Sequence, residues 1–232
     1  MTPYLSVILP SYLEAENLHL LLPRLKTELQ RIGNPYEILV IDTTTPMDET
    51  ERVCQENGAR YVSRGPGNVY GDAVRTGIRE ARGQWILFMD ADGSHAPEFV
   101  SKLVEQAERN DVVIASRYIE GGHTENTLPL KLMSRTLNWT YAFVLNLPYK
   151  DVSNSFKLYR AELLKGLTLR CDNFDLIEEI LFKLRRLNPK LRVVEIPFSF
   201  KKRMFGETKR NLLAFILTYL FTMIRLRFMS LR

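Results

Sequence analysis

The sequence predicts an α/β fold built around a mostly parallel central sheet. Through residues 1–118, short apolar segments rich in Val, Ile and Leu alternate with segments of helical periodicity. Alternation of this kind produces right-handed β-α-β units, whose strands lie parallel in one sheet. The 232 residues can bury a sizeable core, and 45% hydrophobic and 25% charged residues are typical of a globular protein.

Strands in this first part are identified as short runs of β-branched and aliphatic residues. They are expected at Leu5–Leu9, Glu37–Ile41, Arg60–Val62, Trp85–Met89 and Val112–Ala115. Helices are expected between them, near 15–31, 48–57, 71–82 and 97–109. The run Ile86–Met89 is apolar without interruption, which predicts a central strand covered on both faces.

The alternation changes after Arg117. Residues 128–147 form an apolar and aromatic helical segment, and Ser155–Tyr159 and Leu191–Ile196 are strand candidates. A helix is expected at 173–187, where acidic residues come early and basic residues late, because that order complements the helix dipole.

Two carboxylates follow the apolar strand that ends at Met89. Ligands of open α/β sheets bind beyond the carboxyl ends of the strands, and Asp90 and Asp92 lie there. On an extended backbone residues i and i+2 point the same way, so both carboxylates can face one ligand. Hard oxygen ligands suit Mg²⁺ or Mn²⁺ carrying a diphosphate, and a solvated turn is the alternative.

Further candidate residues follow the other strands of the same edge. Tyr12 and Glu14 come after the first strand, where they could contact a nucleobase or serve only in packing and helix initiation. Asp42 ends the second strand, a position that commonly accepts hydrogen bonds from a base or ribose. The Gly-rich loop 65–73 enters a helix, so its backbone N–H groups could receive phosphate or sugar.

Basic residues are concentrated at the C-terminal end. Residues 201–232 contain eight Lys or Arg and one acid, a net charge of +7, whereas the whole chain carries +5. This favours a localised anionic partner and disfavours nucleic acid, whose binding spreads basic residues among stacking aromatics. The uncharged segment 212–224 is shorter than the about 20 residues of a membrane span. It predicts an amphipathic helix on an anionic membrane surface, with packing on its own domain or on a partner's membrane helices as alternatives.

The cysteines and histidines indicate neither a disulfide framework nor a zinc site. Cys54 and Cys171 lie far apart, which is typical of a reducing compartment. The three histidines are scattered and leave no zinc constellation. Because a strand begins almost at the N-terminus, we expect no signal peptide.

Several motifs occur together in a recognisable order. They are PSYLEAEN, VID, the Gly-rich loop, MDADGSH, SRY, SFKLYR and RMFGETK. In these motifs the chain resembles the polyprenyl-phosphate sugar synthases of inverting glycosyltransferase family 2, the dolichol-phosphate mannose synthases among them. The resemblance implies a GT-A (Rossmann-like) fold over 1–210, with a nucleotide-sugar-binding half at 1–118 and an acceptor half at 119–210. It also implies a divalent metal, Mg²⁺ or Mn²⁺, and leaves 211–232 as the amphipathic membrane-interface helix.

The resemblance also implies roles for individual residues. The nucleotide sugar would be bound by Pro10, Tyr12, Glu14, Asp42, Gly71, Asp90 and Ala91. Asp90 and Asp92 would hold the metal, with Asp92 the main ligand and, beside Arg117 and Arg203, one of the catalytic residues. The acceptor phosphate would be bound by Ser134, Arg135, Arg203 and Lys209. A family acid matches either Glu179 or Glu178.

The expected function is inverting transfer of a hexose to a polyprenyl or dolichyl phosphate at the cytoplasmic face of a membrane, by a peripheral enzyme. A phosphate monoester is already anionic, so it needs no general base, whereas two anions must be brought together by metal and cations. GDP-mannose is the favoured donor and UDP-glucose its competitor. A small membrane-anchoring subunit is a further candidate partner.

Two other functions remain open at this point. Transfer to a saccharide hydroxyl would need a general base, for which the candidates are Asp151, Asp175, Glu178 and Glu179. A non-catalytic nucleotide-sugar-binding subunit is suggested by departures from the family pattern. Thr43 stands where a second acid is usual, Val69 where Gly is frequent, and Lys157 where Arg is common.

Overall fold

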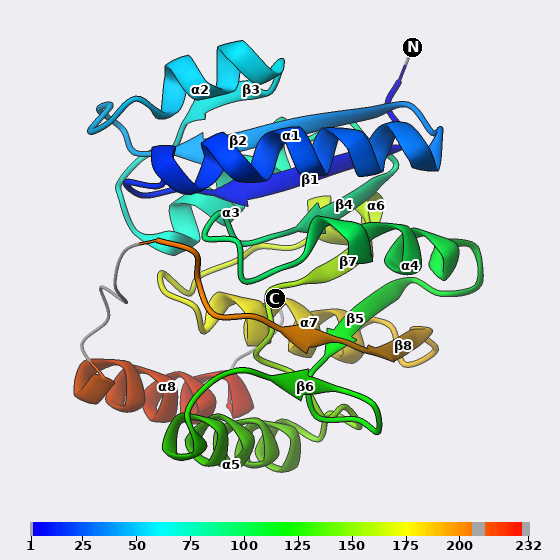
Figure 1. Ribbon diagram of the computed structural model, residues 1–232. Helices are drawn as coiled ribbons and strands as arrows, with labels where there is room; N and C mark the ends of the chain where they lie inside the picture. The colour runs from blue at the N-terminus through cyan, green and yellow to red at the C-terminus, as the bar shows by residue number, and fades with distance from the viewer. Residues whose placement is uncertain (1, 206–211, 229–232) are drawn as a thin grey trace.

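The computed structural model describes residues 2–205 and 212–228 as one α/β unit with a seven-stranded sheet (Figure 1). The strand order is β3-β2-β1-β4-β7-β5-β8. The bounds are β1 Leu5–Pro10, β2 Tyr36–Asp42, β3 Arg60–Ser63, β4 Trp85–Phe88, β5 Val112–Ser116, β7 Lys157–Arg160 and β8 Val193–Pro197. All neighbouring pairs are parallel except those of β7, which runs antiparallel to β4 and to β5. The predicted mostly parallel sheet is confirmed.

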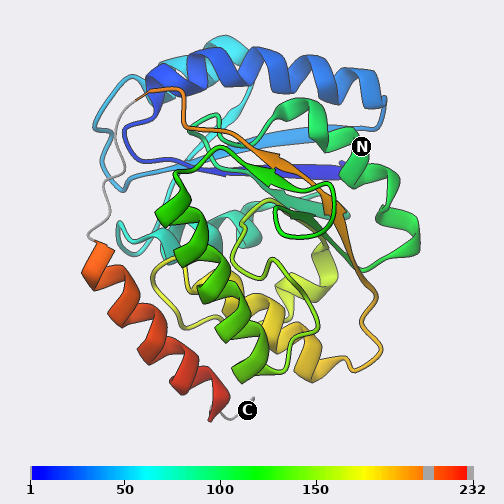
Figure 2. The same cartoon turned by 60° about the horizontal axis from the view of Figure 1, so that its bottom comes forward.

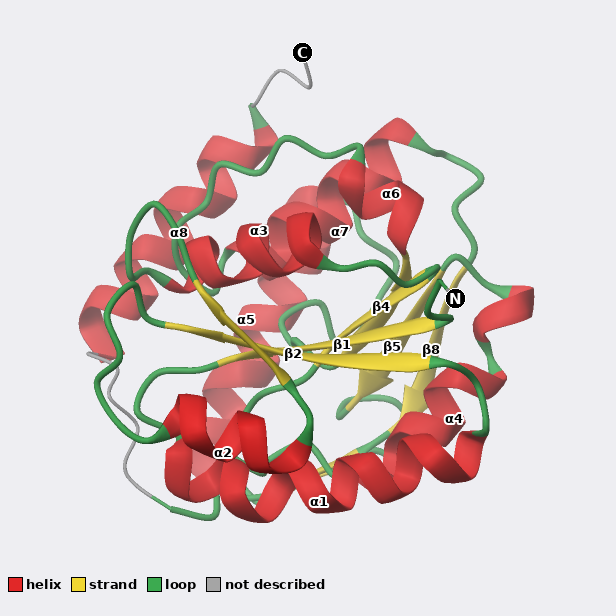
Figure 3. Ribbon diagram, turned by 90° about the horizontal axis from the view of Figure 1, so that it is seen from above, coloured by secondary structure: helices red, strands yellow, loops and turns green. Residues whose placement is uncertain are grey.

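Helices cover both faces of the sheet (Figure 3). One layer contains α1 Ala15–Ile32, α2 Thr50–Asn57 and α4 Val100–Glu105. The other contains α3 Tyr70–Glu80, α5 Leu128–Leu145, α6 Ala161–Lys165, α7 Leu176–Leu187 and α8 Leu212–Arg227. Each layer has its own apolar core against the sheet, which explains why the central strands are apolar on both faces.

Some short elements differ from the expectation. The segment 97–109, predicted as one helix, consists of the 3₁₀ turns Pro97–Phe99 and Ala107–Arg109 around α4. Helix α6 and the two-stranded sheet of β6 His123–Thr124 and β9 Ser199–Phe200 were not predicted. Elements of two to five residues are too short to show a periodicity in sequence.

The antiparallel strand β7 decides which residues meet. Because it pairs antiparallel with both β4 and β5, those two strands run in the same direction. Their carboxyl ends, followed by Asp90 and Arg117, therefore lie at the same edge as those of β1 and β2. The segment that leads into β7, residues 151–156, arrives at this edge as well.

Helix α8 packs on its own domain with one face. Tyr219, Met223 and Leu226 are buried in the core, and Tyr141 Oη of α5 donates a hydrogen bond to Tyr219 O at 2.6 Å. Figure 2 shows α5 and α8 side by side. Within residues 2–205 and 212–228, no helix combines the length and apolar character that crossing a membrane would require.

Two neighbouring leucines of α1 test how this helix packs on the sheet. Leu21 is fully buried and Leu20 is 44% exposed. We expect Leu21→Ala to lower the free energy of unfolding by about 2–5 kcal/mol, because it leaves a cavity in the core. The matched change Leu20→Ala should cost less than about 1 kcal/mol. Urea unfolding measures both, and equal effects would contradict the placement of α1.

Candidate active site

The sheet brings the predicted nucleoside-binding residues to one edge. Pro10 ends β1, Asp42 ends β2, and Asp90 follows β4. Asp42 is 1% exposed, and its Oδ2 atom accepts a hydrogen bond from Tyr61 Oη at 3.2 Å. Within the described part of the chain, Asp42 Oδ1 and Ser11 Oγ are buried without a hydrogen-bond partner. Buried polar atoms are rarely left unpaired, so both atoms keep hydrogen-bonding capacity beside the strand ends.

Arg64, which was not among the predicted site residues, holds this edge together. Its guanidinium is 5% exposed and donates hydrogen bonds to Ser11 O and, at 3.2 Å, to Asn68 O, while its Nε donates to Asp42 O at 3.0 Å. The ends of β1 and β2 are thereby tied to the Gly-rich loop. Burial lowers the pKa of Arg64 and raises that of Asp42. A single arginine before a glycine gives no sequence signal of burial.

The threonine segment that departs from the family pattern is hydrogen-bonded within the same edge. Thr43 is fully buried, and its Oγ1 donates to Thr45 O at 2.6 Å. Thr44 N donates to Asn68 Oδ1 at 2.8 Å, which joins the segment to the Gly-rich loop. The departure therefore lies in an ordered turn beside Asp42.

Other predicted nucleotide-sugar residues differ in exposure. Tyr12 is 41% exposed, whereas Ala91 is 3% exposed. Gly71 is buried at the start of α3, and a Cβ atom there would lie 2.5 Å from Cys171 O. Close packing against residues 171–172 thus accounts for this glycine.

The two predicted metal carboxylates lie in a tight turn after β4. Asp90 Oδ1 accepts a hydrogen bond from Ser155 Oγ at 2.8 Å. Asp92 Oδ1 accepts one from Ser94 N at 3.0 Å, and Gly93 closes the turn with a φ of 79°. The left-handed conformation at Gly93 favours glycine. Both side chains are partly exposed, so they remain accessible to a ligand.

The turn fits a magnesium-type ion held jointly with a substrate. Among residues 2–205 and 212–228, no group of three or more His, Cys, Asp or Glu could hold a metal. Mg²⁺ is commonly bound by one or two carboxylates together with phosphate oxygens. Asp90 and Asp92 supply that number of hard oxygen ligands, whereas a metal held by protein alone would need more.

Arg117 is fixed in a buried ion pair. Its Nε and Nη2 atoms donate to the two carboxylate oxygens of Asp151, at 2.8 and 2.7 Å. The Asp151 side chain is fully buried and that of Arg117 is 9% exposed. Burial alone would raise the pKa of Asp151, but the charge and hydrogen bonds of Arg117 hold it below its ordinary value. The guanidinium is thus oriented before any ligand binds.

A hydrogen-bonded bridge joins Arg117 to helix α5. Ser153 Oγ accepts from Arg117 Nη2 at 3.1 Å and from Asn138 Nδ2 at 2.8 Å. Asn138 Nδ2 also donates to Ser134 O at 2.9 Å, one turn earlier in α5. The carbonyl of Ser134 is thereby connected to Arg117, and Arg135 follows it as an exposed side chain of α5; their predicted role in binding the acceptor phosphate stays a prediction.

The segment 201–205 crosses over the carboxylate turn. Met204 N donates to Asp92 O at 2.9 Å, and Arg203 Nη2 donates to Glu14 Oε1 at 2.8 Å. Burial raises the pKa of Glu14, and the charge of Asp92 adds to the rise. Glu14, Asp92 and Arg203, predicted separately from three motifs, therefore meet in one place. Lys209 lies outside the described residues.

The four carboxylates considered as general bases are all buried. Their exposed fractions are 0% for Asp151, Glu178 and Glu179 and 2% for Asp175. Asp151 pairs with Arg117, Glu179 pairs with Lys183 at 2.6 Å, and Asp175 accepts a hydrogen bond from Thr222 Oγ1. These three side chains are committed to other partners, and Glu178, whose oxygens have no hydrogen-bond partner among the described residues, is 0% exposed. All four are therefore poorly placed to take a proton from an acceptor hydroxyl.

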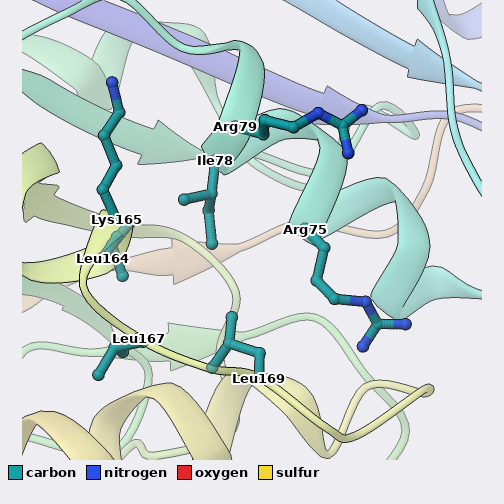
Figure 4. A pocket seen from close by; sticks show the side chains of 7 residues that line it. All are labelled: Arg75, Ile78, Arg79, Leu164, Lys165, Leu167 and Leu169. Carbon is teal, nitrogen blue, oxygen red and sulfur yellow. The ribbon is translucent and has the colours of Figure 1, made fainter.

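A surface hollow of about 390 Å³ lies elsewhere, between α3 and the segment 164–169 (Figure 4). Ile78, Leu167 and Leu169 line it together with cationic side chains. No predicted ligand-binding residue lines this hollow, so it is separate from the candidate site.

An α/β fold that places a carboxylate turn and cationic side chains at one sheet edge suits a transferase whose substrates carry phosphate groups. The model of the family described as glycosyl transferase family 2 matches residues 6–168, and the chain belongs to this family.

Relatives of the chain carry more specific names. It is 36% identical over 212 residues to a dolichol-phosphate mannosyltransferase of Pyrococcus furiosus, covering 88% of this chain and 58% of that protein. It is 33% identical over 219 residues to a polyprenol monophosphomannose synthase of Mycolicibacterium smegmatis, covering 88% and 80%. The chain thus spans little more than half of the Pyrococcus furiosus protein.

Solved structures resemble the chain in fold. Glucosyl-3-phosphoglycerate synthase of Mycobacterium tuberculosis, in complex with Mn²⁺, UDP and glucosyl-3-phosphoglycerate, has a TM-score of 0.72 and 19% identity. The match covers 97% of this chain and 80% of that one. A complex of the same enzyme with Mg²⁺ and UDP has a TM-score of 0.71 and 18% identity, covering 97% and 79%. The predicted GT-A fold is confirmed.

The contributions of Glu178 and Glu179 to folding stability should change with pH in opposite directions. Burial raises the pKa of Glu178 to about 8, so its protonated form suits the fold and stability is lost as the pH rises through that value. The hydrogen bonds that Glu179 accepts from Lys183 and from backbone N–H groups hold its pKa below the ordinary value despite burial, so its contribution is lost as pH falls.

We expect Glu178→Gln to match the wild type at pH 5 and to be more stable by about 2–4 kcal/mol at pH 9. Glu179→Gln should instead be less stable than the wild type at pH 7. Urea unfolding at pH 5, 7 and 9 measures both variants. The assignment would be wrong if the two substitutions shifted stability in the same direction at every pH.

Proposed function

We propose that this chain transfers a hexose with inversion from a nucleotide sugar to a polyprenyl phosphate. The observation that carries the proposal is the meeting of two carboxylates, Asp90 and Asp92, with two cations, Arg117 and Arg203, at one sheet edge. Such a site suits a reaction in which a diphosphate leaves and a second phosphate attacks. The relatives named for transfer to dolichol or polyprenol phosphates support this acceptor.

Mannose from GDP-mannose is the proposed donor group. The supporting relatives, 36% and 33% identical, are both named for mannose. The solved structures that contain UDP are only 18–19% identical, and they bear on the fold alone. The base would lie against Asp42 and Tyr12, with UDP-glucose as the competing donor.

Each charged residue has a distinct part in the proposed reaction. Asp90 and Asp92 would hold Mg²⁺ or Mn²⁺, which when bound neutralises the diphosphate as it leaves. Arg117, already oriented by Asp151, offers its guanidinium to phosphate, and Arg203 exchanges Glu14 for phosphate. The acceptor phosphate oxygen attacks the anomeric carbon as the bond to the diphosphate breaks. No side chain needs to remove a proton, which agrees with the burial of Asp151, Asp175, Glu178 and Glu179.

Transfer of labelled sugar into an organic-extractable product tests this function. The protein is given a short polyprenyl phosphate, Mg²⁺ or Mn²⁺, and GDP-mannose or UDP-glucose in parallel. We expect label in the lipid from GDP-mannose, reduced about 100-fold or more by Asp92→Asn, because a charge-stabilising contact is lost. Asp172→Asn, at a side chain that is 65% exposed, is the matched control and should keep full activity.

Other outcomes have definite meanings. Label from UDP-glucose alone would show that the donor is UDP-glucose and not GDP-mannose. Transfer of label to a saccharide hydroxyl would show that the acceptor is a sugar and not a polyprenyl phosphate. Nucleotide binding without any transfer would favour a non-catalytic subunit, a possibility raised by the segment 43–45.

We further propose that the protein lies peripherally on the cytoplasmic face of a membrane through α5 and α8. Large apolar side chains are exposed on both helices: Leu128, Leu132, Trp139 and Phe143 on α5, and Leu220, Phe221 and Ile224 on α8. Phe228, which is 83% exposed, directly follows them. Exposed Arg225 and Arg227 lie on the same helix. Aromatic residues beside cations suit the interface of an anionic bilayer.

Vesicle sedimentation tests this attachment. The double variant Phe143→Asp with Phe221→Asp should bind anionic vesicles at least about tenfold more weakly, because each buried Phe contributes about 1.5–3 kcal/mol. Leu20→Asp, on the opposite face of the sheet, is the control and should bind normally. If the wild-type protein does not bind vesicles, a membrane-anchoring subunit becomes the better partner for the exposed apolar side chains of α5 and α8.

A further inference from the structure

His95 is completely buried beside the carboxylate turn, and the proposed reaction does not use it. Its ring stacks on Phe156, with centroids 4.6 Å apart and an interplanar angle of 9°. Phe198 and Phe200 meet it edge-on, at 5.9 and 5.6 Å. Three aromatic rings therefore fix the imidazole plane.

Both ring nitrogens contact polar groups. Nδ1 accepts a hydrogen bond from Asp90 N at 2.9 Å, which places the ring proton on Nε2. Nε2 lies 3.2 Å from Asn154 Oδ1 and can donate to it. The imidazole thus connects the backbone of a carboxylate residue to the segment before β7.

Asn154 continues this connection to the cationic side of the site. Its Nδ2 donates to Ala115 O at 2.6 Å, and its backbone N donates to Asp151 Oδ1 at 3.3 Å. Asp151 is the partner that orients Arg117. A continuous buried series of hydrogen bonds therefore runs from Asp90 through His95 and Asn154 to the ion pair.

We propose that His95 is a positioning residue that holds the Asp90–Asp92 turn and, through Asn154, sets it relative to Arg117. The carboxylates and the cation would then share one rigid frame. The functional part of this inference rests on the proposed metal and phosphate site, whereas the positioning part concerns the ligand-free chain.

Amide hydrogen exchange of the ligand-free protein tests the positioning directly. His95→Phe keeps an aromatic ring in the slot but removes the acceptor for Asp90 N–H. We expect exchange across residues 90–94 to accelerate about tenfold or more. His95→Asn, whose Oδ1 can replace Nδ1, should restore most of the protection. The matched control His123→Phe, at an exposed histidine, should leave these amides unchanged.

Mn²⁺ binding in the presence of GDP or UDP, followed by electron paramagnetic resonance, tests the consequence. His95→Phe should weaken Mn²⁺ binding about 10–100-fold, the usual effect of losing a residue behind a metal ligand. His95→Asn should recover affinity. A merely structural role would lower thermal stability in both variants without this difference between them.

The outcomes separate the two proposals. Unchanged exchange at 90–94 in His95→Phe would overturn the positioning role, whatever the protein binds. Absence of Mn²⁺ binding in the wild type would overturn the proposed metal site, while the exchange data would still decide the role of His95. Should His95→Phe fail to fold, Asn154→Ala leaves the imidazole in place but removes the Nε2 partner together with the hydrogen bond to Ala115 O. It should then raise the KM for polyprenyl phosphate and weaken Mn²⁺ binding together, and an effect on neither would overturn the connection.

Discussion

The direction of β7 is the constraint on which the site depends. As an antiparallel strand between β4 and β5, it brings its preceding segment to the edge where those two strands end. Residues of that segment then contact both sides of the site: Ser155 bonds Asp90, and Asp151 bonds Arg117. Lys157 lies beneath, fully buried, and donates to Val152 O at 2.9 Å and to Asn154 O. A parallel strand would deliver these residues to the opposite edge.

The sequence predicted the parts of this arrangement that depend on local pattern. Uninterrupted apolar runs located the central strands, and polar residues after them located Asp42, Asp90 and Arg117. The direction of β7 could not be predicted, because a period of two residues is the same in parallel and antiparallel strands. The connections through Arg64 and His95 were also missed. They join residues far apart in the chain, and a lone arginine or histidine gives no sign of burial.

The buried charges around the site are balanced in two different ways, one at Arg117 and the other at Lys157. Arg117 and Asp151 neutralise one another in a bidentate pair, so their charges are satisfied before substrate arrives. Lys157 has no such pair within residues 2–205 and 212–228: burial lowers its pKa to about 8, and the charges of Asp151, Glu178 and Glu195 oppose the fall. Removing one partner of a buried ion pair such as Arg117–Asp151 leaves the other charge desolvated and unpaired. The resulting loss of stability is larger than the net stabilisation that the intact pair contributes. The interior below the site therefore tolerates few substitutions, although Asp151 and Lys157 themselves need not touch a ligand.

The ion pair between Glu14 and Arg203 has a consequence for how the site meets anions in solution. Without a ligand, Glu14 occupies the guanidinium in the manner of a tethered carboxylate ligand, with both side chains mostly shielded from water. Free inorganic phosphate must compete with this internal anion, whose effective concentration is high because it is part of the same chain. A substrate that gives Glu14 a new hydrogen-bond partner and places a phosphate against Arg203 replaces the interactions that both side chains lose when their ion pair breaks. If Arg203 binds phosphate as proposed, this ion pair would therefore disfavour small anions relative to the full substrate.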